Sequence, residues 1–376
     1  MPQQSPLEIS ELLDRCIDLM SRSEPFINVP DLLACALVAR AWVHPAQSRL
    51  FHAPAHTNPD FSSRLWVVEE FSQSLAISPH LREYVRRLHL DYSALPPYYM
   101  QMLCQQSFTH LESLMVSIEE HDFQTFPTAD NFPQPSTLPA LRHLSLEIKG
   151  PFSLLNSIVQ QFPPTVQHLY LGCTSWDYID TTSDIASTGQ LIQLKSARLS
   201  MWDNGEFAWF APHPRSSYPF DFSQLKALAI IYADSIDWSV IPTSRIEILD
   251  LYVTYEHTAV DLTAFPMLRI LRFCVDRNQI PRIVAETLST VTSQHGIRTI
   301  IISVEHYRMN EAEYTELDTL IASMPMPSLP AVELEHRFHY PPDFAQYFPA
   351  LVSKNLFRVV AYEFVRECWQ ALVNQL

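Results

Sequence analysis

The six residues "LRHLSL", at positions 141–146, carry a pattern that most of the chain repeats. An apolar residue, usually leucine, stands at the first, fourth and sixth positions. Eleven copies of the pattern begin at residues 85, 111, 141, 166, 194, 225, 246, 268, 297, 329 and 356, so successive copies start 21 to 32 residues apart. Spacing this regular is typical of a repeat architecture.

Each copy predicts a short β-strand. Side chains two positions apart in an extended chain share one face, so the last two apolar residues of a copy point into the same core. Proline often precedes the strand, as in "FPML" (265–268), and ends the segment before it. The prediction is an α/β fold with a parallel sheet and a return segment behind each strand. The alternative is an ordinary α/β sheet with coincidental leucines, which the regular period disfavours.

Composition excludes several kinds of protein. The 376 residues are 47% hydrophobic and carry a net charge of −16, which favours a large core and disfavours a nucleic-acid partner. No apolar run reaches membrane-spanning length, and the N-terminus does not resemble a signal peptide. The six cysteines are scattered without any CxxC pair. We therefore expect an intracellular protein, cytoplasmic or nuclear, without a membrane partner.

The few glycines argue against common catalytic motifs. The five of them stand at positions 150, 172, 189, 205 and 296, too far apart for a dinucleotide-binding loop, a P-loop or a nucleophile elbow. The zinc motif HExxH is also absent. The sequence thus predicts a non-catalytic protein with no catalytic residues, cofactor or metal, although an enzyme built on the repeats remains a less favoured class.

The first fifty residues differ from the repeats. "ISELLDRCIDLM" (9–20) has the spacing of an amphipathic helix, and "DLLACALVARAW" (31–42) predicts a second helix. Pro45 is expected to begin a third helix, over 45–52. These features predict a helical domain over 5–52, a helical linker or cap over 53–84, and about eleven repeats over 85–376.

The second helix is apolar on all sides. Leu33 and Leu37 project to one side of it, whereas Cys35, Val38 and Trp42 project to the other. A helix of this kind is buried on all sides, and twelve residues are too few to cross a bilayer. We expect Leu37 to lie in the core of the small domain and the Cys35 side to contact something else.

The N-terminal segments resemble an F-box. The resemblance rests on the leucine pair of "ISELLDRCIDLM", on "DLLACALVARAW" and on "PAQSRLF", and it matches the fungal form of the motif followed by a leucine-rich-repeat region. It implies a three-helix F-box followed by an irregular leucine-rich-repeat solenoid, with a parallel sheet on the concave face.

The same resemblance implies partners and a function. An F-box binds a Skp-type adaptor, which joins it to a cullin–RING ubiquitin ligase, while the repeats present a protein substrate. The adaptor-binding residues it implies are Ile9, Leu12, Leu13, Cys35, Val38 and Trp42. In the alternative, the second side of the helix packs on the first repeats, and the protein is a repeat scaffold independent of the ligase.

The concave sheet face is the expected substrate site. On strands six to eight its positions are apolar, including Ala227, Ala229 and Ile248, so we expect something to cover them. The aromatic stretch 202–222 precedes strand six and is predicted either to fold onto these strands or merely to shield sheet surface. The candidate substrate-binding residues are Tyr170, Arg198, Trp209, Ala229, Ile231, Ile248 and Tyr252.

Overall fold

A computed structural model gives the fold. It describes residues 15–17, 32, 34, 35, 37, 40–52, 61–92, 97–118, 137–148, 162–173, 192–201, 220–231, 238, 241–253, 259–275, 280–304, 311–326, 328–336, 343–361, 369 and 373. The chain divides into two compact units, residues 1–166 and 167–376. This division falls inside the predicted repeat region, and the expected boundary near residue 85 stays a prediction.

All eleven copies of the repeated pattern form strands, and these strands make one sheet. The strands are β1 (Arg87–Asp91), β2 (Ser113–Ile118), β3 (His143–Ile148), β4 (His168–Cys173), β6 (Ser196–Met201), β8 (Ala227–Ile231), β9 (Ile248–Val253), β10 (Ile270–Val275), β11 (Thr299–Val304), β12 (Ala331–His336) and β13 (Phe357–Ala361). They follow one another in the sheet in chain order. The strand pairs within each unit are parallel, which confirms the predicted α/β fold with a parallel sheet. The short strands β5 (Ile192–Gln193) and β7 (Phe220–Asp221) form a separate parallel pair.

The same pair of hydrogen bonds recurs where most strands begin. Two consecutive backbone N–H groups donate to one carbonyl of the preceding repeat, as those of Arg142 and His143 do to Glu112 at 2.9 Å. The pattern recurs at β6, β8, β9, β10 and β11. At β1 the accepting carbonyl is that of His52, at 3.1 and 2.9 Å from the two nitrogens. Residue 52 therefore takes the place that a preceding repeat would hold.

In the first unit, helices accompany strands β1 to β3. They are α3 (Arg40–Leu50), α4 (Phe61–Ile77), η3 (Pro79–Tyr84) and α5 (Pro97–Cys104). Helix α4 lies within residues 53–84, where the sequence predicts a helical linker or cap. Strands β2 and β3 alternate between buried and half-buried side chains, so one face of this part of the sheet meets the core and the other is partly open.

Pro45 does not begin a helix. Helix α3 starts at Arg40 and contains Pro45 as its sixth residue, so the predicted start at 45 is wrong. Proline inside a helix removes the hydrogen bond to the carbonyl four residues earlier. The helix continues because Trp42, Ala46 and Leu50, at spacings of four, pack along one side against the same small core.

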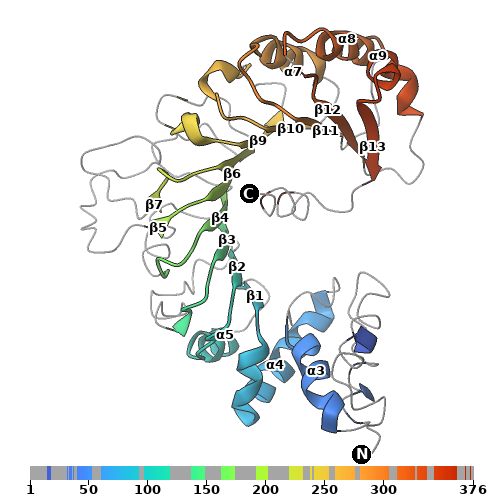
Figure 1. Cartoon of the computed structure of the whole chain (residues 1–376). Coiled ribbons are helices and arrows are strands. Elements are labelled where there is room, and N and C mark those ends of the chain that lie inside the picture. The colour runs from blue at the N-terminus through green and yellow to red at the C-terminus, as the bar shows by residue number, and fades with distance from the viewer. Residues whose placement is uncertain are drawn as a thin grey trace, which may run out of the picture. The chain divides into compact units, whose positions relative to one another are not determined.

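In the second unit, helices lie along one side of the last strands. Figure 1 shows α7 (Ile280–Ser289), α8 (Glu311–Ala322) and α9 (Pro349–Ser353) side by side there. The short 3₁₀ turns η8 (Thr243–Arg245), η9 (Leu262–Ala264) and η10 (Phe344–Tyr347) serve as other return segments. Helix α8 begins with an acidic stretch, residues 311–318.

Buried side chains satisfy the backbone between these return segments. The Oγ1 atoms of Thr287 and Thr290 accept from the N–H groups of Val260 and Leu262, at 3.1 and 2.9 Å. The carboxylate of Asp318, which is 1% exposed, accepts from the backbone of Ala350 and Leu351, at 2.8 and 2.9 Å. Irregular return segments are stable here because their N–H groups find partners in the next segment.

Cys16 and Cys104, in the first unit, should differ in their reactivity toward an alkylating reagent because one is exposed and the other is buried. At pH 8 we expect iodoacetamide to modify the exposed Cys16 and to spare Cys104, which is buried on α5 with its sulfur 4.0 Å from the Tyr92 hydroxyl. Burial raises the pKa of the Cys104 thiol to about 12, so the reactive thiolate is scarce until the pH approaches that value. Peptide mass mapping after brief labelling checks this, and equal labelling of the two cysteines would contradict it.

Candidate functional site: the buried face of strands β8 to β11

The central strands of the second unit are buried on both faces. All five residues of β8 are buried, in contrast to the alternating strands of the first unit. The face on which Ala227, Ala229 and Ile248 lie was predicted to be too apolar to be bare. Each of these three side chains is at most 1% exposed, so the predicted cover exists.

The cover comes in part from the C-terminal end of the chain. Trp369 and Val373 pack in one cluster with Ala227, Ala229, Ile248 and Ile301, and Ile270 packs against the cluster. The aromatic stretch 202–222 was expected to supply the cover, but its residues 202–219 lie outside the described part of the chain. The described cover is thus a different segment from the one predicted.

A buried ionic cluster lies on the same face. Arg272 is fully buried, and its guanidinium donates to Asp250 Oδ2 at 3.1 Å and to Glu335 Oε2 at 2.7 and 3.0 Å. Burial by itself lowers the pKa of Arg272, but the two carboxylates raise it above its ordinary value, so the guanidinium stays charged. We call these three residues the Arg272 triad. It carries one positive and two negative charges.

The triad has an unused acceptor. Asp250 is 4% exposed, and within the described residues its Oδ1 atom is buried without a hydrogen-bond partner. In the register of the sheet, Asp250 lies between Ala229 of β8 and Arg272 of β10. An orphan carboxylate oxygen therefore stands next to the apolar cluster.

The sequence contains a signal for two members of the triad. "IEILDL" (246–251) and "LRILRF" (268–273) place Asp250 and Arg272 at the fifth position of adjacent copies, where paired strands bring them side by side. The partner Glu335 follows 63 residues after Arg272, two repeats further along, and its contact with the guanidinium was not predictable from spacing.

The other predicted substrate residues are mostly covered in this structure. Arg198 is buried with its guanidinium over the Tyr170 ring, 5.4 Å from the centroid. Ile231 and Tyr252 pack with Cys274 in a second buried cluster. Trp209 lies outside the described residues. Ala229, Ile248 and Tyr252 are buried, as the expected cover of this face requires. Their role in substrate binding stays a prediction.

In the N-terminal helices the structure reverses the predicted sides. Cys35 is buried in a small core with Ile17, Leu32 and Ala46, and Trp42 packs against it. Leu37, expected in the core, is 87% exposed. The prediction for Leu37 is wrong because Leu32 and Cys35, three residues apart, define the buried side, and Leu37 projects away from it. The predicted adaptor residues Ile9, Leu12, Leu13 and Val38 lie outside the described residues.

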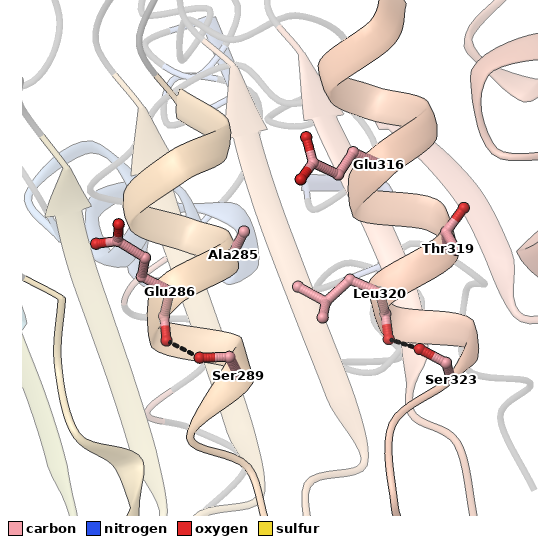
Figure 2. Close-up of a pocket in the computed structure, with 7 residues that line it drawn as sticks. All are labelled: Ala285, Glu286, Ser289, Glu316, Thr319, Leu320 and Ser323. Carbon is pink, nitrogen blue, oxygen red and sulfur yellow. Dashed lines mark hydrogen bonds between the residues drawn. The ribbon is translucent and has the colours of Figure 1, made fainter.

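A shallow groove lies between two helices on the other side of the second unit. Its volume is about 580 Å³, and Figure 2 shows Ala285 of α7 and Leu320 of α8 turned toward the space between the helices. The Ser289 and Ser323 hydroxyls donate to carbonyls of their own helices, at 2.6 and 3.0 Å. Because these donors are already used, the groove offers a ligand little beyond two glutamates.

A scan against protein-family models and a search of curated proteins find no match to this chain. Among the described residues, no three His, Cys, Asp or Glu side chains are grouped so that they could hold a metal ion. The described helices are all too short or too polar to cross a membrane.

Proposed function

We propose that this protein is a substrate-recognition subunit of a Skp–cullin–F-box ubiquitin ligase. Its N-terminal helices would bind the Skp-type adaptor, and its repeats would hold a protein substrate. The proposal assigns no catalysis to this chain, since ubiquitin transfer belongs to the partner subunits. It also takes the eleven strands and their return segments as an irregular leucine-rich-repeat solenoid, with the Ala229 side of the sheet as its concave face.

One observation carries the adaptor proposal. Leu37 is 87% exposed on a segment whose opposite side, at Leu32 and Cys35, closes a small core. A single exposed leucine is ordinary on a protein surface. Here it belongs to the apolar stretch that carries the F-box resemblance, so an adaptor would find an apolar anchor on the open side of this segment.

The recurring hydrogen bonds support the repeat part of the proposal. Successive repeats join through the same donor pair and the same acceptor position, and the series begins at His52, directly after the small helical core. The helices and the repeats of the first unit are thereby linked at a defined point. A receptor needs such a link to hold a substrate at a set distance from the ligase.

An adaptor-binding experiment tests the proposal. The full chain, coexpressed with a Skp-type adaptor, should elute with it as a one-to-one complex in size-exclusion chromatography. Leu37→Asp should weaken this binding at least tenfold, because a charge replaces an apolar anchor that the interface would desolvate, while stability changes little. Ile77→Asp is the matched control, since Ile77 is 81% exposed on α4 and should leave binding intact.

The second candidate is a repeat scaffold that does not engage the ligase. It is favoured by the burial of Cys35 and the packing of Trp42, since two residues that carry the F-box resemblance are used by the small core itself. Failure of the unmodified chain to bind the adaptor would favour this candidate. Equal adaptor binding by Leu37→Asp and the unmodified chain would overturn the assignment of Leu37.

A further inference from the structure

The C-terminal residues Trp369 and Val373 resemble the anchors of a bound helix. Both are in helical conformation, four residues apart, and they are 6% and 4% exposed. Side chains at this spacing share one side of a helix. Both side chains are buried in the cluster with Ala227, Ala229, Ile248 and Ile301. An amphipathic helix laid on an apolar surface makes contacts of this kind.

The strands offer a surface suited to a bulky ring. Two alanines, Ala227 and Ala229, occupy alternate positions of β8. Larger aliphatic side chains stand on the next three strands: Ile248 on β9, Ile270 on β10 and Ile301 on β11. An alanine side chain extends one carbon from the backbone, so a tryptophan ring can approach the sheet closely between larger neighbours. The side chains of β8 to β11 thus form the apolar part of a docking face.

One polar atom beside this face lacks a hydrogen-bond partner within the described part of the chain. Asp250 Oδ1, beside the apolar cluster, is buried without a hydrogen-bond partner among the described residues. A partner that brings a hydrogen-bond donor to this position could satisfy the oxygen. A buried acceptor without a donor is unfavourable, so a partner that supplies the donor would bind this face better than the chain's own residues do.

The position of the anchors in the chain allows such a replacement. Strand β13 ends at Ala361, and Trp369 follows eight positions later, outside the ladder of paired strands. Withdrawal of Trp369 and Val373 from the face breaks no strand pair. A covalent connection this short gives Trp369 and Val373 an effective concentration on the order of millimolar at the face, so they would compete strongly with partners in solution.

We infer that the face of β8 to β11 is a docking site for an amphipathic helix with a tryptophan and an aliphatic residue four positions apart. The chain's own Trp369 and Val373 occupy this site until a partner helix displaces them. The inference rests on the proposed function, which assigns substrate binding to this face of the sheet, and it adds that the substrate binds there through an amphipathic helix. The C-terminal residues then act as an intramolecular competitor of the substrate.

A peptide-binding experiment in the full-length chain tests the inference. The probe is a fluorescein-labelled peptide of residues 363–376, and its binding is followed by fluorescence anisotropy. The full-length double variant Trp369→Ala, Val373→Ala should bind this peptide at least tenfold more tightly than the unmodified chain, because its own anchors no longer compete. A peptide with both anchors replaced by alanine should bind at least tenfold more weakly to the double variant.

Two further variants keep the result interpretable. Adding Ala229→Arg to the double variant should abolish peptide binding, because a long charged side chain would fill the surface that receives the ring. Adding Met267→Ala, at an exposed position of the same unit, should leave binding unchanged. If the double variant unfolds, the single variant Trp369→Phe replaces it and should bind the peptide more tightly than the unmodified chain.

The inference would be overturned if the unmodified chain and the folded double variant bound the peptide equally tightly. It would also be overturned if the peptide with both anchors replaced by alanine bound as tightly as the original peptide. The experiment uses neither adaptor nor ligase. Its failure would leave adaptor binding through Leu37 untouched, and a failure of adaptor binding would leave the helix-docking face standing.

Discussion

Replacement of Arg272 by alanine should lower the free energy of unfolding of the second unit by about 3–5 kcal/mol, because two carboxylates would remain buried without their cation. Arg272 is fully buried, and Asp250 and Glu335 are only 4% and 7% exposed. Removing one partner of a buried ionic cluster leaves the other charges desolvated and unpaired. Urea unfolding followed by circular dichroism measures the loss.

Arg269→Ala is the matched control for this prediction. Arg269 lies three residues before Arg272 and pairs with Glu247 at 3.1 Å, but its side chain is 48% exposed. Water screens such a pair, so the change should cost less than about 1 kcal/mol. A triple replacement, Arg272→Met with Asp250→Val and Glu335→Met, should recover most of the stability, since it removes every buried charge. Similar losses for Arg272→Ala and Arg269→Ala would contradict the burial argument.

Replacement of Phe265 by alanine should also destabilise the second unit by about 3–5 kcal/mol, the usual cost of emptying a buried aromatic site. Phe265 is fully buried directly after η9 and before Pro266. Its ring meets that of Trp238 edge to face, with 5.2 Å between centroids. The loss therefore combines a cavity with a broken aromatic pair.

Met267→Ala serves as the comparison for Phe265. Met267 stands two positions later in the same return segment and is 49% exposed, so its truncation should change the free energy of unfolding by less than about 0.5 kcal/mol. The same urea titrations compare the two variants. If Met267→Ala lowered the free energy of unfolding more than Phe265→Ala, the assignment of Phe265 to the core side of this segment would be wrong.

The sheet was predictable because its signal is local. In "IEILDL" or "LRILRF" the alternation of apolar residues over a few positions is enough to predict a strand, and a repeated period predicts that the strands stack. Each copy became a strand in the expected order. The apolar character of the central face, at Ala229 and Ile248, followed from the same register, so the need for a cover was predictable as well.

The sides of the N-terminal helix were not predictable in this way. A segment that is apolar all round has no periodic signal to distinguish its two sides, so Leu37 and Cys35 were equally suited to the core. Packing against Ile17 and Ala46 decided the question in favour of Cys35. The same packing also explains why α3 continues past Pro45, although proline normally disrupts the interior of a helix.

The sequence by itself determined the order and parallel pairing of the eleven repeat strands, and the face that needed to be covered. Only the tertiary structure decided what covers it and how its charges pair. Trp369 packs in one cluster with Ala229, which stands 140 positions earlier in the sequence, and Arg272 donates to Glu335, which stands 63 positions later. The periodicity of a sequence predicts only which residues share a face of one helix or strand. Contacts between residues this far apart in the sequence depend on how the whole chain folds.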